Sequence, residues 1–140
     1  MIEDIERIGS EGVIFLAARI SRSSKSLEEL LRELEDMKVV KRLIKSLFNL
    51  GHLSVFEHSF VRVYMRDDLG ELKKVFFDYK YVELSGDEEV IISFNLRTAL
   101  EMIQSKNGFL RGLAEKSISE FPILSSILEM ESDRRIDASV

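Results

Sequence analysis

The sequence predicts an α+β domain in which a small antiparallel sheet packs with helices. Apolar residues recur at helical spacing up to about residue 50, β-branched and aromatic residues then gather between Ser54 and Phe94, and helical patterning returns after Asn95. No internal repeat or Pro/Gly-rich linker interrupts the 140 residues, which suffice for one continuous core. We therefore expect a single domain over residues 1–140, with a loose polar tail at residues 129–140.

Composition excludes several classes of protein. The absence of cysteine excludes disulfides, thiolate metal sites and cysteine nucleophiles, and the two histidines are too few for a metal site. The net charge of −5 argues against nucleic-acid binding, although a few arginines in one cleft can still hold a small anion. The densest apolar run, residues 13–18, is too short for a membrane helix, and the acidic start is unlike a targeting peptide. We expect a cytoplasmic protein with no membrane partner.

Two helical regions are predicted before residue 50. Ser10 can cap a helix over residues 10–20, which contains the continuous apolar run. Ser26 followed by Glu29 forms a capping-box pattern, and apolar residues recur at helical spacing from there to residue 48. Either one long helix or two helices broken near Asp36 would satisfy this pattern.

The middle of the chain predicts the sheet. Residues 54–65 form a strand pattern with apolar side chains on both faces, and the polar residues 67–70 break it. Residues 79–85 predict a second strand, although the segment that leads into them also fits a helical turn. Residues 86–89 predict a hairpin loop and residues 90–94 a buried strand.

The remaining residues predict helices again. Asn95 can cap a helix that runs to about residue 106, where Asn107 and Gly108 end it. A further helix is expected to run to Phe121. Pro122, the only proline, suits the first turn of a short final helix.

Three short stretches carry a family resemblance. Residues 17–21 read Ala-Ala-Arg-Ile-Ser, residues 51–58 read Gly-His-Leu-Ser-Val-Phe-Glu-His, and residues 93–97 read Ser-Phe-Asn-Leu-Arg. In this order the chain resembles the flavin-dependent thymidylate synthases, also called thymidylate synthase complementing proteins. In that family a Gly-His, Ser or Thr, Glu-His run leads from a helix into a central strand, and Asn-x-Arg opens a later helix. The resemblance covers most of the chain and implies the fold of that family.

The resemblance implies an activity and an assembly. The family methylates dUMP to dTMP, with the carbon of methylenetetrahydrofolate and the hydride of reduced FAD, which NADPH regenerates. The family needs no cysteine nucleophile, so the absence of cysteine is permissive. Family members are homotetramers whose flavin and nucleotide sites cross subunit interfaces. The resemblance thus implies FAD as cofactor, a small nucleotide as substrate and a homo-oligomer, tetrameric like the family.

The resemblance also assigns flavin contacts. The residues placed at the flavin are Ser21, Ser54 and Glu57 from one subunit, and Asn95 and Arg97 from another. FAD carries a pyrophosphate, which favours a fixed guanidinium with amide or hydroxyl partners. Arg97 in the first turn of a helix would lie beside free backbone N–H groups, an arrangement that suits an anion.

The other candidates carry alternatives. His52 either lines the flavin or bonds backbone at a helix end, and Glu101 stands where the family has an asparagine at the flavin. Glu83 and Ser85 match a Glu-Leu-Ser run of the family's nucleotide site, but they equally suit a turn. Lys106 stands near a nucleotide-binding arginine of the family, and lysine lacks the bidentate geometry of arginine.

One departure from the family leaves the function open. The family's Arg-His-Arg triplet, which holds flavin and the dUMP phosphate, aligns with residues 76–79, Phe-Phe-Asp-Tyr, and Asp78 would repel a phosphate. No arginine or histidine lies between Asp67 and Phe94. Three hypotheses follow: an FAD-dependent thymidylate synthase, a non-catalytic paralogue that keeps the fold as a binding or structural subunit, and an unrelated α+β interaction domain.

Overall fold

One antiparallel sheet organises the fold. Its strands are β1 (Ile2–Ile8), β2 (Phe60–Arg66), β3 (Glu83–Gly86) and β4 (Glu89–Asn95), in the order β1-β2-β4-β3. The structure is a computed structural model that describes residues 2–20 and 23–129. With the helices below, the sheet confirms the α+β class with a small antiparallel sheet.

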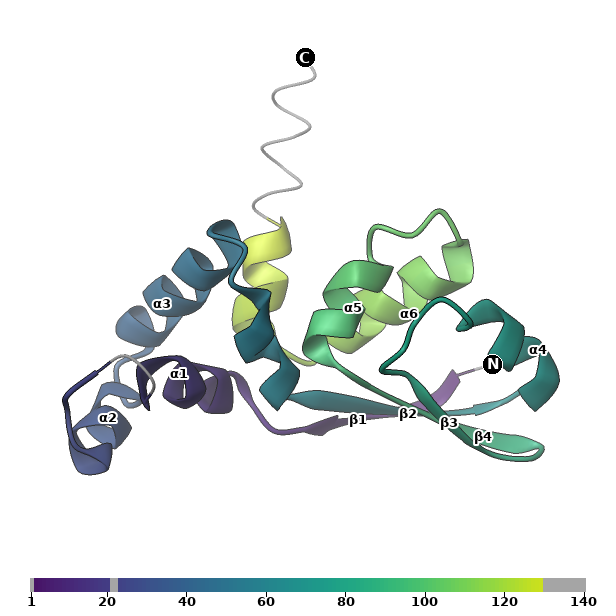
Figure 1. Ribbon diagram of the computed structural model, residues 1–140, viewed down its shortest axis with the longest axis horizontal. Coiled ribbons are helices and arrows are strands. Elements are labelled where there is room, and N and C mark those ends of the chain that lie inside the picture. The colour runs from purple at the N-terminus through teal and green to yellow at the C-terminus, as the bar shows by residue number, and fades with distance from the viewer. Residues whose placement is uncertain (1, 21–22, 130–140) are drawn as a thin grey trace, which may run out of the picture.

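Helices lie on one side of the sheet and beyond one end of it. They are α1 (Glu11–Ile20), α2 (Leu27–Glu33), α3 (Met37–Asn49), the 3₁₀-helix η1 (Leu53–His58), α4 (Leu69–Val75), α5 (Leu96–Met102) and α6 (Gly108–Ile118). A last helix follows over residues 122–129. Figure 1 shows α4, α5 and α6 above the sheet, with α1, α2 and α3 beyond its left end.

The two central strands supply the middle of the core. Buried side chains of β2 lie directly opposite buried side chains of β4: Val61 with Phe94, Val63 with Ile92, and Met65 with Val90. The alternate residues Phe60 and Tyr64 face the other way and are more exposed. This confirms the predicted strand pattern, with apolar side chains on both faces, for residues 60–65. The sheet therefore has one face packed against helices and one open face.

Strand β1 was not expected from the sequence. Four of the seven residues in Ile2–Ile8 are charged, so the alternation that marks a half-buried strand is missing. The strand is nevertheless paired with β2 along an edge of the sheet. The Tyr64 hydroxyl donates to Glu6 Oε2 at 2.9 Å, and Arg66 Nε lies 2.9 Å from Glu3 Oε1. Charged side chains of this kind are typical of edge strands.

One predicted boundary between helix and strand is wrong, and another is confirmed. The strand predicted from Ser54 begins only at Phe60, because the preceding residues form η1 and bury Phe56 completely. Burial of that ring outweighs the β-propensity of Val55 and Phe56. Residues 67–70 do end β2, but Asp68 also opens α4, since its carboxylate accepts from the Glu71 N–H at 3.0 Å.

Side-chain caps set the remaining boundaries. The Asp36 carboxylate accepts from the Lys38 N–H at 3.0 Å, so the alternative of two helices broken near Asp36 is correct. The helix predicted from Asn95 to residue 106 ends at Met102, and the strand predicted over 79–85 begins only at Glu83. Asn107 opens α6, because its Oδ1 accepts from two backbone N–H groups of the first turn.

The last helix is capped from the other end of the chain. Glu11 is buried, and its two carboxylate oxygens accept from the N–H groups of Ile123 at 3.0 Å and Leu124 at 2.7 Å. Pro122 has no N–H, so Glu11 serves the first two donors of this helix. The predicted helix start at Pro122 is confirmed, and helical structure reaches residue 129; the rest of the predicted tail lies outside the described residues.

Arg7 holds the same segment. Its Nη1 donates to the carbonyl oxygen of Glu120 at 3.2 Å, and its guanidinium lies 5.9 Å from the centre of the Phe121 ring. A cation over an aromatic face at this distance is attracted to the ring. The end of β1 and the start of α1 therefore fasten residues 120–124 to the rest of the fold.

The contribution of Glu11 to the stability of the protein depends on pH. Burial raises the pKa of the Glu11 carboxyl above 4.5, while the Ile123 and Leu124 N–H groups and the charge of Arg7 lower it less. A raised folded-state pKa means that the contribution of Glu11 to stability is fully present below pH 4.5 and is lost as pH rises through the folded pKa.

Glu11→Gln removes this titration. We expect the free energy of unfolding of the wild type, relative to Glu11→Gln, to fall as pH rises above 4.5 and then to level off. Urea unfolding at a series of pH values measures this difference, with the exposed Glu120→Gln as control. If the stability of the wild type relative to Glu11→Gln instead grew with pH, the two hydrogen bonds to the Glu11 carboxylate would outweigh the cost of removing that carboxylate from water.

Candidate functional site

The candidate site lies where η1 meets α5, and the turn before η1 depends on glycine. Gly51 has a φ of +74°, a backbone conformation that side chains with a Cβ rarely adopt. A Cβ at this position would meet no atom within 4 Å, so conformation rather than space requires the glycine. The His52 N–H donates to the carbonyl oxygen of Leu47 at 3.0 Å, and η1 follows directly.

Ser59 fixes the position of η1 against two other segments. Its fully buried hydroxyl donates to the carbonyl oxygen of Ser10 at 2.9 Å. Its own carbonyl oxygen accepts from the Leu96 N–H at 2.9 Å. One residue thus joins the starts of α1, β2 and α5. Sequence reasoning missed Ser59, since a lone serine between His58 and Phe60 belongs to no recognisable pattern.

An ion pair joins two of the three motif stretches. Arg97 Nη1 donates to Glu57 Oε1 at 2.8 Å, and each of the two side chains is 41% exposed. Ser54 lies one 3₁₀ turn before Glu57, so their side chains share one side of η1. Glu101 lies one α-helical turn after Arg97 on the same side of α5. These four residues, Ser54, Glu57, Arg97 and Glu101, form what we call the η1–α5 cluster.

The cluster offers few donors to a ligand. Arg97 Nε and Nη2 have no hydrogen-bond partner in residues 2–20 and 23–129, so they can still donate outward. The two carboxylates outnumber the single guanidinium, and Glu57 already neutralises Arg97. An anion must therefore compete with Glu57 for the guanidinium.

Asn95 is a helix cap. Its Oδ1 accepts from the Thr98 N–H at 2.8 Å, and the residue is buried. The expected cap is confirmed. The expectation of free backbone N–H groups beside Arg97 is wrong for two of them, because Leu96 donates to Ser59 and Thr98 donates to Asn95. The start of α5 is thus largely satisfied within the protein.

The other predicted site residues lie apart from the cluster or at its margin. His52 is exposed at the start of η1. Glu83 and Ser85 pair with Ser93 and Ile91, so they lie on the open face of the sheet. Lys106 is exposed in the segment between α5 and α6. Ser21 lies outside the described residues.

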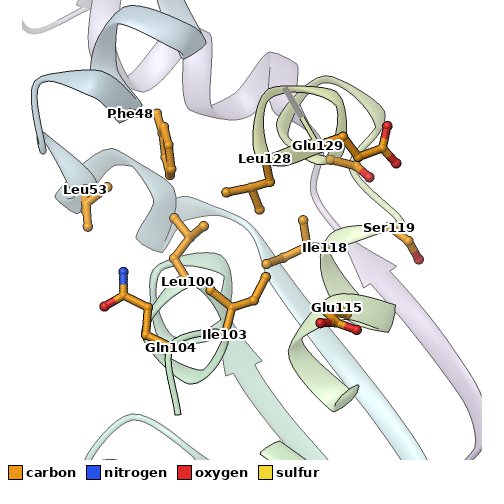
Figure 2. A pocket seen from close by; sticks show the side chains of 11 residues that line it. Phe48, Leu53, Leu100, Ile103, Gln104, Glu115, Ile118, Ser119, Leu128 and Glu129 are labelled. Carbon is orange, nitrogen blue, oxygen red and sulfur yellow. The ribbon is translucent and has the colours of Figure 1, made fainter. Parts of the chain in front are cut away.

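A groove opens beside the cluster. It has a volume of about 780 Å³ and lies between α3, η1, α5, α6 and the last helix. Figure 2 shows Phe48, Leu100, Ile103, Ile118 and Leu128 pointing toward a common space. The other lining residues are Leu53, Gln104, Glu115, Ser119, Ser125 and Glu129. No predicted site residue lines this groove, although Leu53 and Gln104 are neighbours of the cluster in sequence.

A second cavity, of about 260 Å³, lies beside Glu11. It is lined by Arg7, Ser10, Glu11, Gly12, Leu34, Met37, Val40, Pro122 and Ile123. Its walls therefore include the residues that fasten the last helix. None of the predicted flavin or nucleotide residues contributes to it.

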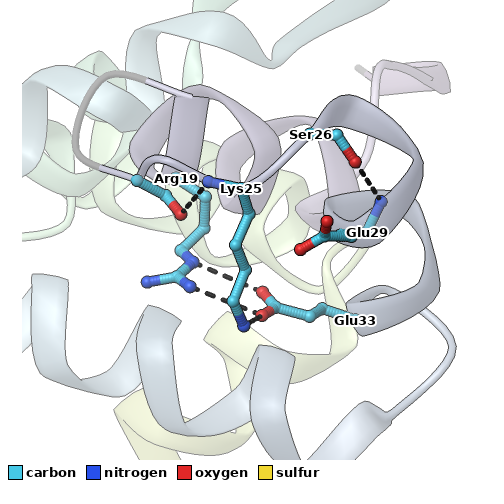
Figure 3. Close-up of polar contacts among 6 residues, drawn as sticks. Arg19, Lys25, Ser26, Glu29 and Glu33 are labelled. Carbon is cyan, nitrogen blue, oxygen red and sulfur yellow. Dashed lines mark hydrogen bonds and ion pairs between the residues drawn. The ribbon is translucent and has the colours of Figure 1, made fainter.

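The first motif stretch takes part in a separate charge cluster. Arg19 Nε lies 3.3 Å from Glu33 Oε2, and Lys25 also pairs with Glu33 (Figure 3). The hydrogen bond from Lys25, followed by the contacts with Arg19, lowers the pKa of Glu33 against the effect of its partial burial. These contacts tie the end of α1 to α2. Packing between two helices therefore accounts for Arg19 without a ligand.

Other features of the described residues bear on the function class. Residues 2–20 and 23–129 contain no group of three or more His, Cys, Asp or Glu arranged to hold a metal ion. None of their helices combines the length and apolar character needed to cross a bilayer.

No known protein-family model matches the sequence, and no curated protein matches it.

The capping role of Asn95 can be tested through the stability of the protein. We expect Asn95→Ala to lower the free energy of unfolding by about 1 kcal/mol, because the Thr98 N–H loses its acceptor. Asn95→Asp, which keeps an acceptor oxygen, should retain most of the stability. Urea unfolding measures both variants, and an alanine variant as stable as the wild type would contradict the cap.

The exposure of the ion pair limits its contribution to stability. A double-mutant cycle with Glu57→Gln and Arg97→Gln should give a coupling free energy of about 0.5 kcal/mol, and it should weaken at high salt. Urea unfolding of the four proteins at two salt concentrations supplies the measurement. A coupling well above about 1 kcal/mol would place the pair in a less solvated setting than its exposure indicates.

Proposed function

We propose that this chain is a flavin-dependent thymidylate synthase-like protein that binds FAD at the η1–α5 cluster. The family reaction is the FAD-mediated reductive methylation of dUMP to dTMP with methylenetetrahydrofolate. What supports the proposal is the 2.8 Å contact between Glu57 and Arg97. It brings residues 51–58 and 93–97, two of the three motif stretches, together at the ends of the two central strands. The same proposal implies a cytoplasmic homo-oligomer, tetrameric like the family.

The chemistry of the cluster fits part of a flavin site. The outward Nε and Nη2 groups of Arg97 suit a pyrophosphate, and Glu57 orients the guanidinium through its Nη1. The exposed Ser54 hydroxyl can donate to the same ligand or to a polar ring edge. The cluster lies outside both cavities described above, so a flavin held here needs a cover from a second subunit.

A second candidate is a non-catalytic paralogue that acts as a binding or structural subunit. Residues 76–79, which align with the family's arginine triplet, favour this second candidate. Residues 76–79 offer aromatic rings and the carboxylate of Asp78, and the ring of Phe77 is directed to solvent. Positioning and charge stabilisation of a phosphate are what such a triplet supplies, and this chain has no arginine there.

Absorbance separates the two candidates. If the protein binds FAD, the purified chain will show flavin bands in the visible range, or will acquire them on titration with FAD. Arg97→Ala should then weaken FAD binding by about 1–3 kcal/mol, because a charged hydrogen bond is lost. Arg111→Ala, on the exposed side of α6, is the matched control and should bind as the wild type does.

The opposite results are equally informative. A colourless protein that ignores added FAD would support the non-catalytic subunit. Flavin binding that is unchanged in Arg97→Ala would remove the η1–α5 cluster from the site.

A further inference from the structure

The segment between α4 and β3 exposes two aromatic rings. Phe77 is 85% exposed and Tyr81 is 70% exposed, the two highest values among the large apolar residues of the described chain. Residues 73–81, which we call the aromatic turn, also carry three lysines and one aspartate. Lys74 pairs with Glu71 at 3.4 Å, whereas Lys73 and Lys80 form no ion pair within residues 2–20 and 23–129. Exposed aromatic rings are typical of interaction surfaces.

The groove between α3, η1, α5, α6 and the last helix is apolar and carries negative charge, so it complements the aromatic turn. Its apolar wall consists of Phe48, Leu53, Leu100, Ile103, Ile118 and Leu128. Its charged lining residues are Glu115 and Glu129, and no lysine or arginine lines it. Neither carboxylate forms an ion pair with any part of the chain that the structure describes. An apolar group flanked by cations would complement this groove, because the apolar group can pack against the apolar wall and the cations can pair with the two carboxylates.

We propose that the aromatic turn of one copy of this chain docks into the groove of a second copy. In this contact Phe77 enters the apolar groove, and Lys73 and Lys80 lie near Glu115 and Glu129. The volume of about 780 Å³ accommodates one or two aromatic side chains, which rank among the strongest anchors in protein interfaces. Phe77 is exposed to solvent in the single chain, so its ring does not occupy the groove of its own copy, and α4 lies on the opposite side of the view in Figure 1 from α3 and the last helix.

The contact goes beyond the proposed flavin site and does not require flavin. It joins two different surfaces, so it produces a closed ring, a reciprocal dimer or an open chain according to the rotation between copies. In a reciprocal dimer each copy would give its turn and receive the other's. All three assemblies depend on Phe77 and on the two carboxylates.

Sedimentation velocity of the full chain without FAD tests the contact. The wild type should associate with rising concentration. Phe77→Asp should raise the dissociation constant at least about tenfold, since it puts a charge in the apolar groove. The double variant Glu115→Lys/Glu129→Lys should do the same by repelling the lysines of the turn. Leu27→Asp, on the exposed surface of α2, is the matched control and should associate as the wild type does.

Mixing the two weakened variants identifies the pairing. The Phe77→Asp protein keeps its groove, and the Glu115→Lys/Glu129→Lys protein keeps its aromatic turn. The mixture should therefore form a one-to-one complex, although each variant alone does not. A monomeric wild type, unchanged association of either variant, or a mixture that stays monomeric would each overturn the proposal. All the changed side chains are exposed, and far-UV circular dichroism verifies that the variants are folded.

Discussion

The arrangement of the candidate site depends on the hydrogen bonds of Ser59. Its hydroxyl reaches the carbonyl oxygen of Ser10, and its carbonyl oxygen receives the N–H of Leu96. The approach is close, since a Cβ at Gly9 would lie 3.0 Å from the Ser59 hydroxyl oxygen, and Gly9 has a φ of +93°. Glu57 lies two residues before Ser59, and Arg97 directly follows Leu96. The ion pair between the two motif stretches is therefore held by backbone bonds behind it, which leaves its own contribution to stability small.

Contacts between the two ends of the described chain hold one wall of the groove in place. The last helix forms one wall, and its first two N–H donors are bound by Glu11 from the start of α1. Arg7 adds a bond to the residue before Phe121. These contacts span more than a hundred residues of sequence. The N-terminal segment has a charged sequence with no clear pattern, yet it holds in place the C-terminal helix that forms one wall of this groove.

Local chemistry explains which parts of the fold the sequence could predict. Helix starts could be predicted where one residue favours them by itself. The side chains of Ser26, Asp36 and Asn95 accept hydrogen bonds from nearby backbone N–H groups. The ring of Pro122 suits the first turn of a helix. The alternation of β2 is equally local. By contrast, β1 owes its strand structure to pairing with a partner some 55 residues away, and η1 owes its shape to the burial of Phe56. The Glu57–Arg97 contact was reachable only through a family resemblance, and Ser59 had no signal at all.

Electrostatics decides what a single copy of this chain can bind. The chain has a net charge of −5, and the guanidinium that faces the cluster is already paired with a carboxylate. A phosphate that approaches one copy therefore gains little from Arg97 unless Glu57 yields or further cations arrive. The cations of the aromatic turn are lysines, which act as point charges and lack the bidentate fork of arginine. These lysines therefore suit the rim of an interface better than the positioning of a phosphate.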